Sequence, residues 1–319
     1  RGIDQLESEM KKYFPRTSIA EESGESLTIS VIGAPNVGKS SLINSMVQSS
    51  RMIVSDMPGT TRDSVATKFS LTDAGGKKWN ISIIDTAGLR AFGKMDSPIE
   101  YFSSVRAREA VKKSNVVLLL LDAMRGLTKF DKKIAQEIWD EGKALMVVVN
   151  KWDLVKIAFR EGSLERWENL SELQKDFSET LRRELFRWNL PPMHFVCAKT
   201  GENISKMLGG SLQVSQRAKE KISTGALNRF FEKCMEEREP VHRKGSTQVF
   251  KILYVLQTEV DPCVIRIYCN HKRLMDSDYE SYLRNRLVRE FHLNGCPVHF
   301  NLQERPPRNR KAQRFSAKN

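Results

Sequence analysis

A glycine-rich motif near the start of the chain has the spacing that binds nucleotide phosphates. Residues 33–40 read Gly-Ala-Pro-Asn-Val-Gly-Lys-Ser, which matches G-x-x-x-x-G-K-[ST] between an apolar run and a helical pattern. The glycines let backbone amides and a helix N-terminus face negative charge. We expect Lys39 to reach the β- and γ-phosphates and Ser40 to bind Mg²⁺. The predicted phosphate-contacting residues are Gly33, Asn36, Val37, Gly38, Lys39, Ser40 and Ser41.

Two further segments would complete the magnesium and γ-phosphate contacts. Asp85 begins Asp-Thr-Ala-Gly after the apolar run 79–84, and an Asp at a strand end can hold Mg²⁺ through water. Gly88 leaves space for a backbone amide to meet the γ-phosphate. In the segment 59–63, Thr61, in preference to Thr60, is expected to bind Mg²⁺. We expect the segments 59–63 and 88–103 to be switches that the γ-phosphate orders.

The base-selecting residues follow two later strands. Residues 150–153 read Asn-Lys-Trp-Asp, and Asp153 can accept both N1–H and the exocyclic amine of guanine, a donor pair that adenine lacks. The aliphatic part of Lys151 can lie over the base. Residues 197–199 read Cys-Ala-Lys, where GTPases carry Ser-Ala-Lys or similar, and the Ala198 amide is expected to face guanine O6. The predicted base-contacting residues are Asn150, Lys151, Asp153, Cys197, Ala198 and Lys199.

The catalytic step departs from the Ras pattern. Ras-like GTPases carry a water-orienting Gln directly after the Asp-x-x-Gly glycine, and this chain has Leu89 there. A hydrophobic side chain cannot orient water, so Asn36 becomes a candidate to recruit K⁺ near the β–γ bridge. The residues expected to act in hydrolysis are Lys39, Asn36, Thr61 and Gly88.

The elements that would position these residues alternate between strands and helices. Strands are predicted at 27–32, 68–71, 79–84, 116–121, 144–149 and 194–196, which favours an α/β domain with a mostly parallel sheet covered on both faces. After residue 223 the pattern changes to a small α+β domain with helices at 226–239 and around 279–291 and strands at 249–256, 264–269 and 297–302. We therefore divide the chain into a helix (1–14), a linker (15–26), a nucleotide-binding domain (27–223), the α+β domain (224–304) and a basic tail (305–319).

The charge balance points to an anionic partner. The formal net charge is +13 and the pI about 9.5, a balance that most often reflects nucleic acid. Residues 224–319 hold 18 Lys and Arg against 11 Asp and Glu, and the tail holds six basic residues and no acidic one. No apolar run approaches the roughly 20 residues of a membrane span, so no membrane partner is expected. The five cysteines show no metal-ligand spacing.

The chain resembles the Der/EngA family of ribosome-assembly GTPases. The resemblance lies in residues 33–44, 54–63, 84–90 and 149–155, and in the C-terminal run 279–287. It implies a second GTPase domain followed by a KH-like domain, with residues 1–14 closing a first GTPase domain. It also implies GTP/GDP and Mg²⁺ as ligands, K⁺-stimulated hydrolysis through Asn36, and a role in large-subunit maturation. The implied partners are ribosomal RNA and the large-subunit precursor, with other assembly factors.

Several features leave other interpretations open. The glycines of the KH-like part stand at 225, 245 and 295, so the G-x-x-G backbone clamp on RNA is absent. A tRNA-modification GTPase of the MnmE type shares residues 59–63 and the phosphate-loop Asn36, but that family ends in a catalytic cysteine and this chain ends in Ser-Ala-Lys-Asn. A scaffold that binds GTP without contacting RNA is the third interpretation. The basic tail and departures from the family pattern such as Cys197 and Met57-Pro58 slightly favour an organelle matrix, that of the mitochondrion, over a bacterial cytoplasm.

Overall fold

The protein is described from a computed structural model that covers residues 25–49, 67–73, 75–84, 105–185, 191–240 and 248–304. The predicted N-terminal helix, most of the linker and the basic tail lie outside these residues. Glu25 and Ser26, the last two residues of the predicted linker, pair with Trp79 and Asn80 in the first strand.

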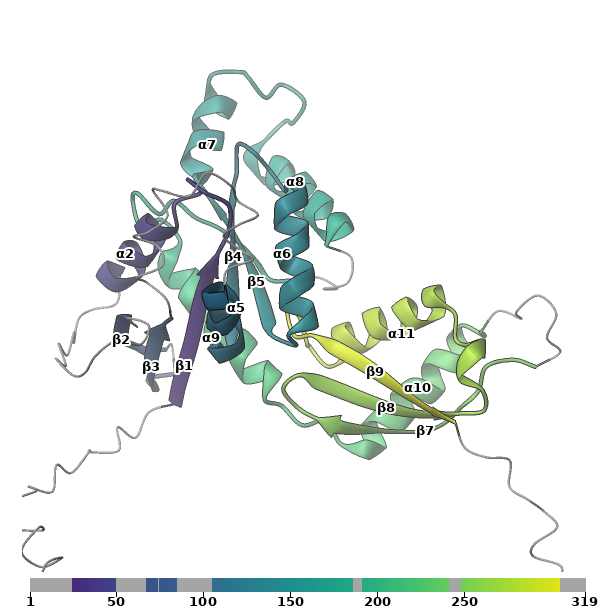
Figure 1. The fold of residues 1–319 in the computed structure, drawn as a ribbon. Helices are drawn as coiled ribbons and strands as arrows, with labels where there is room; N and C mark the ends of the chain where they lie inside the picture. The colour runs from purple at the N-terminus through teal and green to yellow at the C-terminus, as the bar shows by residue number, and fades with distance from the viewer. Residues whose placement is uncertain are drawn as a thin grey trace, which may run out of the picture.

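A six-stranded sheet in the order β2-β3-β1-β4-β5-β6 forms the first unit (Figure 1). Only β2 runs antiparallel to its neighbour, which confirms the predicted α/β fold with a mostly parallel sheet. The strands are β1 (Glu25–Ile32), β2 (Thr67–Thr72), β3 (Lys78–Ile83), β4 (Val116–Asp122), β5 (Ala144–Asn150) and β6 (Met193–Phe195).

Helices cover both faces of this sheet because its central strands are apolar on both sides. Every residue of β4 and β5 is buried, as expected of inner parallel strands. One apolar cluster joins the sheet to α2 (Lys39–Ser49) and α9 (Ile204–Ala218). A second cluster joins the other face to α5 (Val105–Lys113), α6 (Lys129–Asp140), α7 (Trp152–Arg160) and α8 (Leu170–Glu184). No helix within the described ranges is long and apolar enough to cross a membrane.

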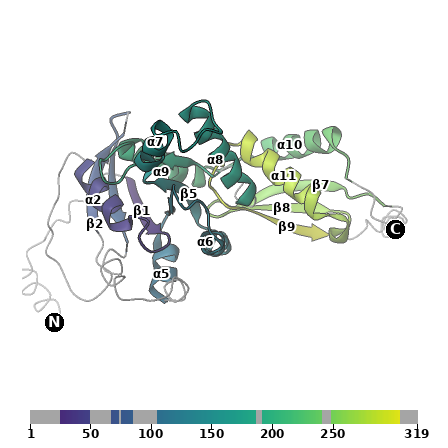
Figure 2. The same cartoon turned by 90° about the horizontal axis from the view of Figure 1, so that it is seen from above.

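The C-terminal unit is a three-stranded sheet with two helices on one face (Figure 2). It contains α10 (Thr224–Glu237), β7 (Ile252–Glu259), β8 (Cys263–Cys269), a short 3₁₀ turn η3 (Lys272–Leu274), α11 (Ser277–Glu290) and β9 (Val298–Glu304). Strand β8 pairs antiparallel with β7 and parallel with β9. Its residues alternate between buried and half-buried, the pattern of a sheet packed on one face.

The C-terminal unit docks at the amino-terminal ends of the first sheet's strands. The amide of Leu145, near the start of β5, donates a hydrogen bond of 2.7 Å to the Gly295 carbonyl. At the end of α6, the Trp139 ring lies 5.1 Å from the His299 ring and 5.6 Å from the Arg284 guanidinium. One apolar cluster continues from the first sheet through α9 into this unit. The two units are therefore joined by a packed interface.

Candidate nucleotide site

The glycine-rich loop joins β1 to α2 at the carboxyl-terminal edge of the sheet. A Cβ atom on Gly33 would lie 2.2 Å from the Leu120 carbonyl oxygen, so only glycine lets the loop pass this close to β4. Gly38 has φ +97°, a conformation that side chains strongly disfavour. Asn36 also adopts a left-handed conformation, with φ 63°. Helix α2 has no acidic residue in its first turn, so its N-terminus remains suited to an anion.

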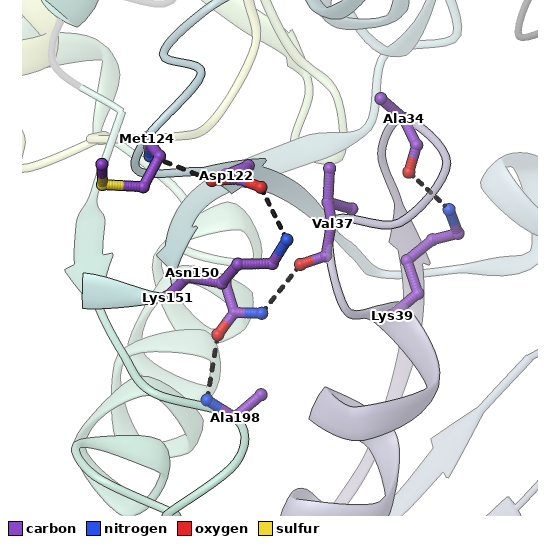
Figure 3. A network of polar contacts seen from close by, with 8 residues as sticks. All are labelled: Ala34, Val37, Lys39, Asp122, Met124, Asn150, Lys151 and Ala198. Atoms are coloured by element: carbon purple, nitrogen blue, oxygen red, sulfur yellow. Dashed lines mark hydrogen bonds and ion pairs between the residues drawn. The ribbon is translucent and has the colours of Figure 1, made fainter. Parts of the chain in front are cut away.

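Lys39 is held inside this loop. Its ammonium donates to the Gly33 carbonyl oxygen at 2.9 Å. It also donates to the Ala34 carbonyl oxygen at 2.8 Å (Figure 3). Burial lowers the pKa of Lys39 to about 8, and the negative charge of Asp131 acts in the opposite direction. Asp131 lies in the capping box that opens α6. Sequence reasoning missed it, although its spacing from Thr128 is a recognisable capping signal.

Asn150 ties two loops together at the end of β5. Its side-chain amide nitrogen donates to the Val37 carbonyl oxygen at 2.8 Å, and its side-chain oxygen accepts from the Ala198 amide at 2.9 Å (Figure 3). A Cβ atom on Gly38 would lie 2.4 Å from that amide nitrogen. The Ala198 amide, expected to face guanine O6, thus already has an acceptor. Asn150 acts as a strut between the phosphate loop and the loop after β6.

Asp122, at the end of β4, is a site residue that the sequence analysis did not single out. It is paired with Asn150 in the sheet register, and its carboxylate accepts from the Lys151 ammonium at 2.7 Å and from the Met124 amide at 2.9 Å. Burial alone would raise its pKa, but these two hydrogen bonds hold the pKa of Asp122 below its usual value. Its place at a strand end beside Asn150 is the signal that could have identified it.

The remaining base-pocket candidates gather at the same edge. Lys151 has φ 62° and precedes α7, which places Asp153 in the first turn of that helix. Trp152 anchors this turn, because its amide donates to the Val196 carbonyl and its ring packs 4.4 Å from the Phe195 ring. In the loop after β6, Cys197 is buried and Lys199 is exposed. The structure therefore brings the phosphate-loop and base-pocket candidates to one edge.

The described geometry fits the phosphates of a nucleotide. A loop that needs two glycines, a buried lysine and a helix N-terminus can take phosphates, and Ser40 lies exposed in the first turn of α2 beside them. The other magnesium and hydrolysis candidates, Thr61, Asp85 and Gly88, lie outside the described residues, as does Leu89.

Both parts of the chain match models of known protein families. Residues 28–151 match the family model described as 50S ribosome-binding GTPase, and residues 221–303 match the model of the KH-domain-like C-terminal region of EngA bacterial GTPase enzymes. GTPase Der of Chlorobium luteolum is 34% identical over 304 residues, which cover 95% of this chain and 65% of that protein. GTPase Der of Acetivibrio thermocellus is 36% identical over the same shares. The structure of Aquifex aeolicus Era bound to GDP and AlF₄⁻ aligns over 91% of this chain with a TM-score of 0.40 and 18% identity.

The fold and the site thus define a P-loop GTPase domain followed by a KH-like domain. The chain belongs to the Der/EngA family of GTPases. It spans 65% of the length of the two curated relatives named above.

Proposed function

We propose that this protein binds GTP with Mg²⁺, hydrolyses it, and acts as a switch in maturation of the large ribosomal subunit. The observation that carries the proposal is the joined pair of loops at the sheet edge. Asn150 connects the Val37 carbonyl to the Ala198 amide, so the phosphate loop and the base loop form one preorganised site. The match to a family described as 50S ribosome-binding GTPase supports the ribosomal role.

Each residue would have a defined part in binding. Lys39 exchanges its two backbone acceptors for phosphate oxygens, and Asp153 accepts the two guanine donors. Asp122 holds the Lys151 ammonium at 2.7 Å, which orients the Lys151 stem toward the base. Ser40 would hold Mg²⁺ with Thr61 and Asp85, and the ion would neutralise charge that develops between the β- and γ-phosphates. The Gly88 amide would meet the γ-phosphate.

We further propose that K⁺ stimulates hydrolysis through Asn36. Asn36 is exposed in the phosphate loop and has φ 63°, so its amide side chain is accessible to solvent and to an ion. A cation held there would stabilise the charge that an arginine finger stabilises elsewhere.

The proposed partners are ribosomal RNA, the large-subunit precursor and other assembly factors. The KH-like match supports RNA contact, and the curated relatives named GTPase Der favour this role over tRNA modification. The division into a first-domain helix, linker, GTPase domain, KH-like domain and basic tail belongs to the same proposal. So does an organelle matrix as the favoured compartment, although the relatives named above are bacterial.

The test is hydrolysis and ribosome binding by the same preparation. The purified chain should hydrolyse GTP in the presence of Mg²⁺ and pellet with large-subunit precursors. Lys39→Ala should abolish hydrolysis. A chain that hydrolyses GTP but shows no salt-dependent binding to RNA or precursors would support the scaffold interpretation.

A further inference from the structure

The sheet of the KH-like domain has one face that no described helix covers. Helices α10 and α11 lie on the other face (Figure 2). Along β8, Ile265 and Ile267 are buried toward these helices. Because side chains alternate along a strand, Arg266 and Tyr268 lie on the opposite face. We call this face the open sheet face and define it by Tyr254, Leu256, Arg266, Tyr268, Asn301 and Gln303.

Two tyrosines form an aromatic surface on the open sheet face. Tyr254 of β7 lies directly opposite Tyr268 of β8 in the register. Their ring centroids are 6.1 Å apart with an interplanar angle of 42°, and Tyr254 is 38% exposed. On the other side of Tyr268, the register places Gln303 of β9. Aromatic rings on a sheet, next to an amide side chain, suit a base that stacks and pairs through its edge.

Arg266 supplies a hydrogen-bond donor in the middle of the open sheet face. The register places it between Leu256 and Asn301. Its Nε atom is buried and has no hydrogen-bond partner among the described residues. A buried unpaired N–H is costly, so an acceptor from a ligand would stabilise this position. A base carbonyl, a ring nitrogen or a phosphate oxygen would serve.

The charge of the C-terminal sequence, above all that of residues 305–319, favours an anionic ligand over a protein segment. Residues 224–319 hold 18 Lys and Arg against 11 Asp and Glu. Strand β9 ends at Glu304, next to the register position of Gln303 and Tyr268. The sequence then continues with six basic residues and no acidic one. In the sequence, this basic run therefore directly follows the strand that carries Asn301 and Gln303.

We propose that the open sheet face binds unpaired bases of single-stranded RNA. Tyr254 and Tyr268 stack on bases, the Arg266 guanidinium donates to a base or phosphate oxygen, and Asn301 and Gln303 hydrogen-bond base edges. This inference rests on the proposed function, whose RNA partner it locates on a specific surface. It also provides an RNA contact that does not need the missing G-x-x-G clamp.

The experiment measures fluorescence anisotropy of a short labelled single-stranded RNA, and of the same strand annealed to its complement, with the 319-residue chain. Tyr254→Ala should weaken single-strand binding about 5- to 100-fold, the effect of losing one stacked base, and should affect the duplex less. Tyr254→Phe retains the ring and should retain affinity. Arg266→Gln should weaken binding more than Arg229→Gln, which removes the same charge from an exposed position on α10. GTP hydrolysis should be unchanged in all four variants.

The proposal would be overturned if Tyr254→Ala and the unsubstituted chain bound single-stranded RNA with equal affinity. The open sheet face would then be assigned to a protein partner instead. If circular dichroism shows that Tyr254→Ala does not fold, the test becomes the comparison of Arg266→Gln with Arg229→Gln. Equal affinities of these two variants for single-stranded RNA would then overturn the proposal. An unsubstituted chain that binds neither RNA form yet hydrolyses GTP would remove the RNA partner from the proposed function as well. RNA binding that persists unchanged in every variant would leave that function intact and refute only this surface.

Discussion

Replacing Asn150 tests whether one side chain holds the nucleotide site together. Asn150→Asp retains an oxygen that can accept from the Ala198 amide, but it places a second oxygen against the Val37 carbonyl, where the amide now donates at 2.8 Å. One favourable hydrogen bond thus becomes a repulsive contact in a buried position. Leaving a buried acceptor unpaired costs about 1–3 kcal/mol, and more when a charge is involved. We expect the free energy of unfolding to fall by at least that amount.

The matched control is Asn228, an amide that also donates to and accepts from backbone. It bonds the Val255 carbonyl at 2.7 Å and the Val255 amide at 2.9 Å within the KH-like domain. Asn228→Asp should therefore destabilise the protein by a similar amount. Only Asn150→Asp should weaken GDP binding, by about tenfold or more, since 1.4 kcal/mol corresponds to a factor of ten. Urea unfolding and titration with a fluorescent GDP measure the two quantities. Equal loss of GDP affinity in both variants would refute the claim that Asn150 holds the nucleotide site together by linking the two loops.

Three further predictions follow from other contacts. Burial lowers the pKa of Lys39 to about 8, and a bound phosphate favours the charged form of its side chain. GDP affinity should therefore fall about tenfold per pH unit above pH 8, and calorimetry should detect proton uptake on binding. A GDP affinity that does not change as the pH rises would contradict this. Replacing K⁺ by Na⁺ should slow GTP hydrolysis several-fold, and Asn36→Ala should abolish the difference, whereas equal rates in both salts would exclude the cation role. Gly295→Ala should destabilise the protein by about 1–3 kcal/mol, because its Cβ would lie 2.5 Å from the Leu145 carbonyl oxygen, while Gly76→Ala, with a similar φ of +80° and no atom within 4 Å, should cost less in urea unfolding.

The strands and the edge that carries the site could be predicted from local sequence. Inner strands such as β4 and β5 are continuous apolar runs, and each motif follows a strand end, so parallel pairing alone brings the motifs together. The prediction for β7 was shifted, because it counted the apolar residues 249–256 while the ladder with β8 runs from Ile252 to Glu259. Polar residues at a sheet edge carry no periodic signal that would extend the strand.

The contacts that join distant segments could not be predicted in this way. Asn150 was predicted to contact the base, and its hydrogen bonds with Val37 and Ala198, 113 and 48 residues away, were not foreseen. The docking of Gly295 against Leu145 likewise depends on the close approach of two backbones. The residue types at these two positions give no sequence signal for that contact. Docking at the amino-terminal ends of the strands also places the KH-like domain away from the phosphate loop. A change on hydrolysis must reach that domain through the body of the GTPase domain or through segments outside the described residues.

Nucleotide selectivity tests the central claim most directly. GTP, ATP and XTP would compete with a fluorescent GDP for the unsubstituted chain and for Asp153→Asn. If Asp153 reads guanine, GTP should displace the probe from the unsubstituted chain and ATP should not. Asp153→Asn should shift the preference toward XTP, because the amide reverses one donor–acceptor pair. Equal displacement by GTP and ATP would contradict the account of this site as a guanine-nucleotide switch.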